Sequence, residues 1–409
     1  MTEPVPIDPP RVCFPFTGGQ LGGSHISALK LIQNLDPRRI RPVVVLQDSG
    51  GPLAAFLREQ GQPFVSFDAG EILLPGRRRA LSLGAFITRT LPNIRRFIRE
   101  GRFEIVHTND AKTHVNWGVA ARLAGARVVW HHRGDPDAMG ANWLAPLIAD
   151  QMITVSRFAR PRRPIRSLES RLSVIHSPFD KPAVIPDREK AKAELAALLG
   201  VAPGTPVLSF VANLVERKRP FLFLEILARF RNQHPDIPAV GCVFGVSPAG
   251  RIDLEPAMRA RAASLGLGET VRFMGFRSPI EPYLAATDIL LVPAMGEPFG
   301  RTLIEAMFLG TPVVATRHGG NPEAIQNDHT GILVEPENAE AFVEPIARLL
   351  ADPGTWMRIS RTAAVHVHSA FSSAHHAEQV ERVYDRALRQ RFRTRVDAKL
   401  SERMPGEAY

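Results

Sequence analysis

The chain has 409 residues, a length that suggests two medium-sized domains. Apolar residues make up 44% and charged residues 22%, which is ordinary for a globular enzyme and excludes a disordered or collagen-like chain. Lysine and arginine number 51 against 41 acidic residues, and the formal net charge of +10 favours an anionic partner such as nucleic acid, a membrane surface or a phosphorylated small molecule.

The cysteines and the N-terminus indicate the compartment. Cys13 and Cys242 lie far apart in apolar, strand-like runs, so we expect neither a disulfide framework nor a zinc site, and a reducing cytosol is favoured. The proline-rich start of the chain does not resemble a signal peptide. No apolar stretch reaches the roughly 18–20 residues of a membrane-spanning helix. We therefore expect a cytoplasmic protein that contacts a membrane at most peripherally, at its inner face.

Short apolar runs alternate with helical segments in the first part of the chain. The predicted strands are Arg11–Thr17, Pro42–Gln47, Phe64–Asp68, Glu104–Thr108, Arg127–His132, Met152–Ser156 and Leu172–His176. Amphipathic helices are predicted between them, among them Ser24–Leu35, Leu53–Gln60 and Thr113–Leu123. Strands that are apolar on both faces and separated by helices indicate a parallel sheet covered by helices on both sides.

A proline-rich segment, Ser177–Arg188, interrupts this alternation and is interpreted as a linker. A second series of predicted strands follows: Val207–Asn213, Ala239–Phe244, Val271–Gly275, Asp288–Pro293, Pro312–Thr316 and Gly331–Val334. The predicted fold is α/β, with two Rossmann-like, doubly wound domains facing each other across a cleft lined by the carboxyl ends of their strands. Their expected bounds are 1–180 and 181–370, and a helix with a basic tail, 371–409, is expected to pack back on the N-terminal domain.

The most informative stretch runs from Pro293 to Gly320. A strand ends there, a loop with Glu297 follows, and a helix starts near Arg301, so the backbone N–H groups of its first turn suit a phosphate or a sugar hydroxyl. Glu305 lies eight positions after Glu297, and each carboxylate has two oxygens that accept hydrogen bonds from vicinal hydroxyls. Taken alone, the two glutamates are better explained as an exposed helix residue, Glu305, and a helix-start carboxylate, Glu297.

In its setting, this stretch resembles the signature of the retaining glycosyltransferases of family 4, which have the two-domain GT-B fold. That signature places seven residues between two glutamates within E-x-F-G-x-x-x-x-E-A-M-x-x-G-x-P-V-V-A-T-x-x-G-G. Each of its fixed positions is present from Glu297 to Gly320. The resemblance implies a nucleotide-sugar donor bound mainly by the C-terminal domain.

The resemblance also implies roles for single residues. Glu305 would bind the nucleotide ribose and Glu297 the hydroxyls of the donor sugar. The segment around Phe276 and Arg277 would contact the base. The backbone facing the sugar and diphosphate would come from Pro298, Phe299, Gly300, Arg301 and Thr302.

Upstream, FVANLVERKRP occupies the place where the family usually has G-R-L-x-x-x-K-G. Lys218 matches the lysine, a point charge for diphosphate oxygens, although a lysine in a surface turn would look the same. The family's arginine is replaced by Asn213 and the glycine after the lysine by Arg219. The departure removes a forked cation that would stabilise a leaving diphosphate, and either Arg217 or Arg219 would have to supply that charge.

The N-terminal half offers candidates for the acceptor side. Gly22 and Gly23, in a glycine cluster before the first helix, resemble the family's loop that faces the diphosphate. The strand end WHHRGDP holds His131, His132 and Arg133, of which one is expected to face the sugar, with His131 and Arg133 as catalytic candidates. The neighbouring strand ends in VHTND, which offers His107, Asn109 and Asp110 as further candidates. The spacing of these histidines does not match a metal site, and no metal or other cofactor is expected.

The stretch Arg77–Arg102 holds eight arginines and one glutamate among Leu, Phe and Ile, and indicates basic amphipathic helices broken by Pro92. It is either a solvated face or a surface that attaches to anionic lipid headgroups. A second basic segment runs from Arg386 to Lys399. No aromatic stacking pattern or recognised RNA-binding motif accompanies the charge, which argues against nucleic acid as a partner.

The predicted function is a retaining glycosyltransferase of the hexosyltransferase type. It would move a sugar from a nucleotide-diphosphate sugar to a hydroxyl of a carbohydrate or lipid-linked acceptor, in the synthesis of a polysaccharide or cell-envelope intermediate. Two alternatives stay open. One is a nucleotide-sugar epimerase or hydrolase with the same fold, and the other is a non-catalytic scaffold that binds nucleotide sugars.

Overall fold

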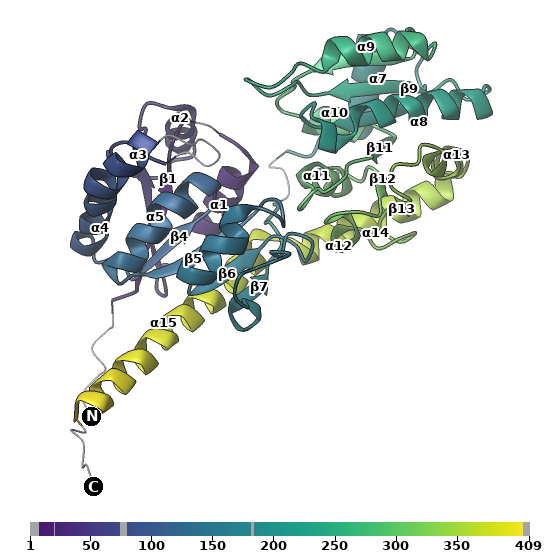
Figure 1. Cartoon of the computed structure of the whole chain (residues 1–409). Coiled ribbons are helices and arrows are strands. Elements are labelled where there is room, and N and C mark those ends of the chain that lie inside the picture. The colour runs from purple at the N-terminus through teal and green to yellow at the C-terminus, as the bar shows by residue number, and fades with distance from the viewer. Residues whose placement is uncertain (1–7, 20, 74–79, 181–183, 404–409) are drawn as a thin grey trace. The chain divides into compact units, whose positions relative to one another are not determined.

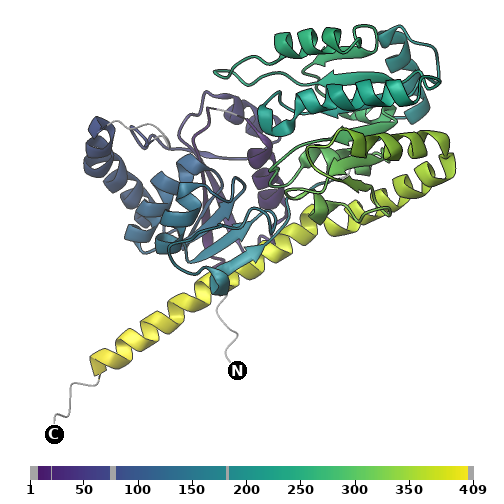
Figure 2. The same ribbon diagram turned by 45° about the vertical axis from the view of Figure 1, so that its right-hand side comes forward.

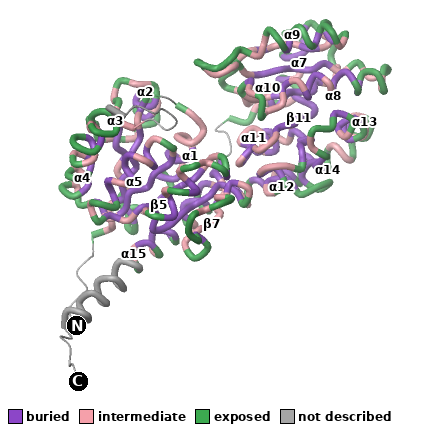
Figure 3. The backbone as a smooth tube through the Cα atoms, viewed as in Figure 1, coloured by how far each residue is buried: buried purple, intermediate pink, exposed green. Residues whose placement is uncertain are grey.

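The structure is a computed structural model that describes residues 8–19, 21–73, 80–180 and 184–403, with the side chains of 80–82 and 390–403 left out. It divides into two compact units. The N-terminal unit consists of Met1–Pro178 together with Ser373–Tyr409, and the C-terminal unit of Phe179–Ser372. In both units the central strands are mostly buried and the outer helix faces are exposed (Figure 3).

The N-terminal unit is built on a parallel seven-stranded sheet with the order β3-β2-β1-β4-β5-β6-β7 (Figure 1). Its strands are β1 (Arg11–Phe16), β2 (Arg41–Leu46), β3 (Val65–Ser66), β4 (Ile105–Thr108), β5 (Arg127–His132), β6 (Gln151–Thr154) and β7 (Leu172–Val174). Its helices are α1 (Gly23–Asn34), α2 (Pro52–Glu59), α3 (Ala80–Ala85), α4 (Leu91–Glu100), α5 (Ala111–Ala124), α6 (Ala145–Ile148) and α15 (Ser373–Arg403). Short helical turns are η1 (Phe86–Thr90), η2 (Gly140–Leu144) and η3 (Glu169–Arg171).

Side chains of β1 alternate between two cores, as expected for a sheet covered on both faces. Val12 and Phe14 pack with α1, α2 and α15, whereas Cys13 packs with α4 and α5. The last helix, yellow in Figures 1 and 2, is part of the first of these cores through residues such as Val380 and Tyr384. The segment farthest along the chain thus completes the N-terminal core.

The C-terminal unit has a parallel six-stranded sheet with the order β10-β9-β8-β11-β12-β13. Its strands are β8 (Val207–Val211), β9 (Val240–Phe244), β10 (Val271–Gly275), β11 (Ile289–Val292), β12 (Val313–Thr316) and β13 (Ile332–Val334). Its helices are α7 (Arg188–Leu199), α8 (Pro220–Gln233), α9 (Glu255–Ser264), α10 (Glu281–Ala286), α11 (Arg301–Phe308), α12 (Asn321–Ala324), α13 (Val343–Ala351) and α14 (Pro353–Ala370), with the turns η4 (Glu216–Lys218) and η5 (Glu340–Phe342). The predicted α/β class with two Rossmann-like domains is confirmed, and each predicted strand overlaps a strand of the structure.

One local prediction was wrong: Pro92 does not break the helical stretch that precedes residue 102. Helix α3, the π-helical turn η1 and α4 follow one another without a gap, and Pro92 is the second residue of α4. A proline removes one backbone donor and crowds the preceding turn, and the wider π turn directly before it accommodates the ring. Residues 77–79 of this stretch lie outside the described residues. Among the residues that are described, no helix has the length and apolar character needed to span a membrane.

Candidate functional site

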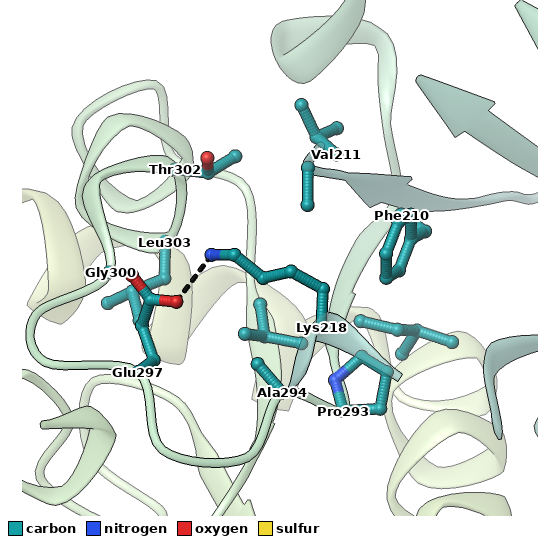
Figure 4. A pocket seen from close by; sticks show the side chains of 12 residues that line it. Phe210, Val211, Lys218, Pro293, Ala294, Glu297, Gly300, Thr302 and Leu303 are labelled. Carbon is teal, nitrogen blue, oxygen red and sulfur yellow. Dashed lines mark ion pairs between the residues drawn. The ribbon is translucent and has the colours of Figure 1, made fainter. Parts of the chain in front are cut away.

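A small pocket lies within the C-terminal unit, where the neighbouring strands β8 and β11 end (Figure 4). It encloses about 340 Å³ of empty space, part of it open to solvent. Its lining residues are Phe210, Val211, Ala212, Lys218, Leu291, Val292, Pro293, Ala294, Glu297, Gly300, Thr302 and Leu303. The order of this sheet reverses between β8 and β11, so the pocket lies at the topological switch point where open α/β sheets bind ligands. We call it the switch-point pocket.

Two cations converge on one carboxylate at this pocket. Lys218 Nζ lies 2.6 Å and Arg217 Nη1 2.5 Å from Oε2 of Glu297. Figure 4 shows the Lys218 side chain extended toward that carboxylate. The Glu297 side chain is 10% exposed and that of Lys218 19%, so this pair is poorly screened by water. The ion-pair contact of both cations is thus with the same oxygen, Oε2.

The loop that carries Glu297 is held by backbone contacts with two glycines of the signature. Gly320 N–H donates to the Glu297 carbonyl at 2.8 Å. Gly319 has φ +65°, and a Cβ there would lie 2.5 Å from the same carbonyl oxygen. Only glycine fits this conformation and this close approach. A further bond, from Met295 N–H to the Arg217 carbonyl at 2.7 Å, ties the loop to the segment that carries both cations.

Helix α11 begins at the pocket. Gly300 precedes the helix, Thr302 lies in its first turn, and both line the pocket. The Phe299 side chain is 6% exposed and contacts the rings of Phe179 and Phe371, with centroid distances of 6.3 and 5.4 Å. Its side chain therefore belongs to the core of the unit, and only its backbone can contact a ligand.

Glu305 does not line the switch-point pocket. It forms an ion pair with Arg301, one turn earlier on α11, at 3.2 Å. The Arg301 guanidinium also lies over the ring of Phe179 at 4.6 Å. Burial raises the pKa of the Glu305 carboxyl above its ordinary value, and the charge and hydrogen bond of Arg301 oppose that rise.

The structure separates the two arginines proposed to replace the missing forked cation. Arg217 lies at the pocket, whereas Arg219 Nε pairs with Glu337 Oε1 at 2.6 Å. Arg219 has φ +55°, the left-handed conformation that glycine adopts at least cost, which explains the family's glycine at this position. Asn213 is exposed and does not line the pocket. Phe276 also lies apart from the pocket, with 69% of its surface exposed.

In the N-terminal unit, His131 belongs to a buried chain of hydrogen bonds. Its Nδ1 lies 3.1 Å from His107 Nε2 and 3.3 Å from Arg133 Nη2, and His107 Nδ1 lies 2.6 Å from the Tyr384 hydroxyl. The chain links the ends of β4 and β5 to α15. Burial lowers the pKa of both histidines well below the ordinary value, and the nearby charge of Arg133 lowers it further. Both imidazoles are therefore neutral, and His131 itself is fully buried.

A larger cavity of about 1470 Å³, partly open to solvent, lies in front of these strand ends. It brings together the polar candidates Asn109, Asp110, His132, Arg133 and Asp135. Much of the remaining lining is apolar: Ala111, Val115, Trp130, Ala138, Met139, Ala141, Trp143 and Leu144. We call it the N-terminal cavity. Gly22 and Gly23 lie at the start of α1, and the next residue, Ser24, also lines the cavity.

Some residues that shape these sites escaped the sequence analysis. His318 Nδ1 accepts a hydrogen bond from Gly296 N–H at 3.0 Å and so fixes the Glu297 loop. The sequence signal that could have identified His318 was its position within the signature, between Thr316 and the two glycines. Met139 and Trp143 gave none, because single apolar residues in a helical segment look like core residues. Among the described residues, no group of three or more His, Cys, Asp or Glu could hold a metal ion.

Two family models match this chain. The model described as Glycosyltransferase Family 4 matches residues 21–181, and the model described as Glycosyl transferases group 1 matches residues 192–366.

Similar curated proteins are D-inositol 3-phosphate glycosyltransferases. The one from Corynebacterium glutamicum is 32% identical over 220 residues, which is 53% of this chain and 52% of the relative. The one from Nocardia farcinica is 32% identical over 205 residues, covering 49% and 44%. The chain thus spans about half the length of the curated relatives it matches.

Solved structures resemble the chain over most of its length. HepE of Anabaena, in complex with UDP and glucose, has a TM-score of 0.76 at 22% identity and covers 91% of this chain and 99% of its own. Sucrose-phosphate synthase of Thermosynechococcus elongatus has a TM-score of 0.72 at 19% identity and covers 94% and 100%. At these identities the likeness shows the fold, which is GT-B.

Proposed function

Because two glycosyltransferase models match residues 21–181 and 192–366 of this chain, we propose that it transfers a sugar, with retention of anomeric configuration, from a nucleotide-diphosphate sugar to a hydroxyl acceptor. The observation that supports this most strongly is the convergence of Lys218 and Arg217 on Glu297, beside the start of α11. Two cations against one carboxylate leave net positive charge where a departing diphosphate needs it.

The chemistry we propose relies on position and charge. Lys218, Arg217 and the first N–H groups of α11 would stabilise the leaving diphosphate. Glu297 would accept a hydrogen bond from a hydroxyl of the donor sugar through Oε1, while its Oε2 stays with the two cations. The departing diphosphate would take the proton of the acceptor hydroxyl on the same face of the sugar, so no side-chain nucleophile and no resident metal is required.

The donor and acceptor follow from weaker indications. HepE was solved with UDP and glucose, so UDP-glucose is the first donor to test. For the acceptor we propose a lipid-linked envelope or polysaccharide intermediate, because of the basic charge of the chain. D-inositol 3-phosphate, after the name of the curated relatives, is the comparison acceptor.

Release of nucleotide diphosphate from a panel of UDP-, GDP- and ADP-sugars tests the proposal. Each donor is incubated alone, with a bacterial lipid extract and with D-inositol 3-phosphate. Acceptor-dependent release, with the anomeric configuration of the product determined by NMR, supports retaining transfer. Acceptor-independent turnover would instead identify an epimerase or hydrolase, and binding without turnover a scaffold. Transfer with inversion would contradict the retaining mechanism.

A further inference from the structure

The N-terminal unit exposes large apolar side chains close to its cavity. Met139 is 78% and Trp143 64% exposed, and both line the N-terminal cavity. Leu147, one turn after Trp143, and Ile165 are each 48% exposed. A group of exposed large apolar side chains is unusual on a monomeric protein and marks an interaction surface.

An arginine-rich segment borders these side chains. Residues 157–166, RFARPRRPIR, contain five arginines and no acidic residue. The segment is bonded to the turn that carries Trp143, because Arg163 N–H donates to Asn142 Oδ1 at 2.7 Å and Ile165 N–H to the Asn142 carbonyl at 2.9 Å. The apolar and basic residues therefore form one continuous surface, which we call the interfacial surface.

The charges of this surface are only partly neutralised. Arg160 pairs with Glu169 at 2.7 Å and Arg162 with Asp137 at 2.5 Å. Arg163 and Arg166 are exposed, and neither has an ion-pair partner within the described part of the chain. Positive charge at this surface therefore remains available to an anionic partner.

We propose that the interfacial surface docks on an anionic lipid bilayer. Tryptophan prefers the boundary between headgroups and acyl chains because its ring is apolar and its N–H is polar. Exposed arginines beside it bind lipid phosphates and gain about fivefold in affinity each at an anionic surface. Both features occur here on adjacent segments that the two hydrogen bonds to Asn142 hold together, so they can act on one bilayer at once.

Helix α4, the last part of the basic stretch that precedes residue 102, fits this role less well. The apolar side chains Ile94 and Ile98 of α4 are buried in the core of the unit. Arg95 Nε donates to the Leu123 carbonyl at the end of α5, where its charge also stabilises that helix end. What α4 presents to solvent is therefore mainly charge, and the exposed apolar side chains of the stretch, Leu83 and Ile87, precede it on α3 and η1. On the interfacial surface, by contrast, the segments that carry the apolar and the basic side chains are joined by hydrogen bonds.

Docking at this surface would also orient the enzyme. Because Met139 and Trp143 belong both to the interfacial surface and to the wall of the N-terminal cavity, the bilayer would lie beside that cavity. A lipid-linked acceptor could then reach it without leaving the membrane. The docking itself goes beyond the proposed transfer reaction and is measurable without any substrate, so the two can fail separately.

Vesicle co-sedimentation of the full chain tests the proposal. We expect binding to vesicles of phosphatidylcholine with 30% phosphatidylglycerol and at least tenfold weaker binding to phosphatidylcholine alone. Arg163→Gln with Arg166→Gln should weaken binding to the anionic vesicles about 25-fold, at fivefold for each arginine. The matched control, Arg96→Gln with Arg99→Gln, removes the same charge from α4 and should change binding less than threefold.

Tryptophan emission gives a second readout. Of the four tryptophans, Trp143 is exposed, Trp117 and Trp130 are buried, and Trp356 is half-buried with its ring N–H bonded to the Asp288 carbonyl. Vesicles should therefore shift the emission to the blue in the wild type and not in Trp143→Ser. Three results would overturn the proposal. The first is vesicle binding that is lost in the control pair but kept in the Arg163 and Arg166 pair, and the second is a blue shift that persists in Trp143→Ser. The third is a wild-type protein that does not bind vesicles but binds a single-stranded oligonucleotide, with that binding lost in the Arg163 and Arg166 pair.

Discussion

Lys218 and Glu297 form an ion pair of 2.6 Å, although they follow different strands, β8 and β11. Lys218 belongs to the turn η4, which follows the first strand of the C-terminal sheet. Glu297 belongs to the signature segment, which follows the fourth strand. The pairing exists because β8 and β11 are neighbours at the point where the strand order reverses. The two motifs therefore form one charged site, and a change in either residue affects the other.

Replacing Lys218 tests the role of this site in turnover. In Lys218→Ala we expect kcat to fall at least tenfold, about 1.4 kcal/mol of lost stabilisation of the departing diphosphate. Lys190→Ala, which removes an exposed lysine from α7 of the same unit, is the control and should keep full activity. Unchanged kinetics in a folded Lys218→Ala protein would remove the lysine from the mechanism.

The loop of Glu297 depends on the missing side chain of Gly319. Gly319→Ala would bring a Cβ to 2.5 Å from the Glu297 carbonyl oxygen at φ +65°. We expect a loss of at least about 3 kcal/mol in the free energy of unfolding, with loss of turnover because the carboxylate moves. Gly204 also has a positive φ, +85°, but a Cβ at that position would meet no neighbour within 4 Å, so Gly204→Ala should cost only about 1 kcal/mol. Equal urea midpoints for the two variants would contradict the steric argument.

The stability contributed by Glu305 should decrease with rising pH. Its pKa is raised in the folded state, so its contribution is fully present below the ordinary glutamate pKa and is lost as the pH rises through the folded value. Glu305→Gln should therefore raise the melting temperature at pH 7.5 and change it little at pH 4. Titration calorimetry with UDP should show weaker binding in the same variant if the carboxylate holds the ribose. The exposed Glu194→Gln is the control, and a Glu305→Gln protein that melts below the wild type at pH 7.5 would contradict this account.

Acid should destabilise the N-terminal unit through its buried histidines. Burial lowers the pKa of His376 to about 3 and that of His107, His114 and His131 well below the ordinary value of about 6.5. The unfolded chain then binds more protons than the folded one below pH 6.5, so stability falls as the pH falls, by about 1.4 kcal/mol per pH unit for each histidine.

Urea unfolding between pH 7 and 5 measures this slope. His376→Gln should reduce the pH dependence of the free energy of unfolding by the contribution of one histidine, about 1.4 kcal/mol per pH unit. His329→Gln, at an exposed position, should leave this pH dependence unchanged. A slope that is the same in the wild type and in His376→Gln would show that this histidine does not titrate on unfolding.

The sequence predicted the bounds of strands better than it predicted local backbone conformation or side-chain pairing. Strands such as Arg127–His132 and Val271–Gly275 have the predicted bounds because continuous apolar runs between helical segments allow little else. The course of the backbone at Pro92 was not predictable, because the π turn that accommodates the ring depends on how the whole helix packs. The sequence shows Arg219 as a departure from the family pattern, but its left-handed conformation and its pairing with Glu337 depend on the tertiary fold.

The sequence by itself determined the two parallel α/β units, the resemblance to glycosyltransferases and the positions of both glutamates, since these depend on local apolar periodicity and on one contiguous motif. Only the tertiary structure decided that Arg217 rather than Arg219 accompanies Lys218 at Glu297, that His131 is buried between His107 and Arg133, and that Trp143 is exposed beside an arginine-rich segment. The physical reason is that strand order and side-chain direction bring together residues that are distant in the chain, and neither is encoded in the spacing of a single segment.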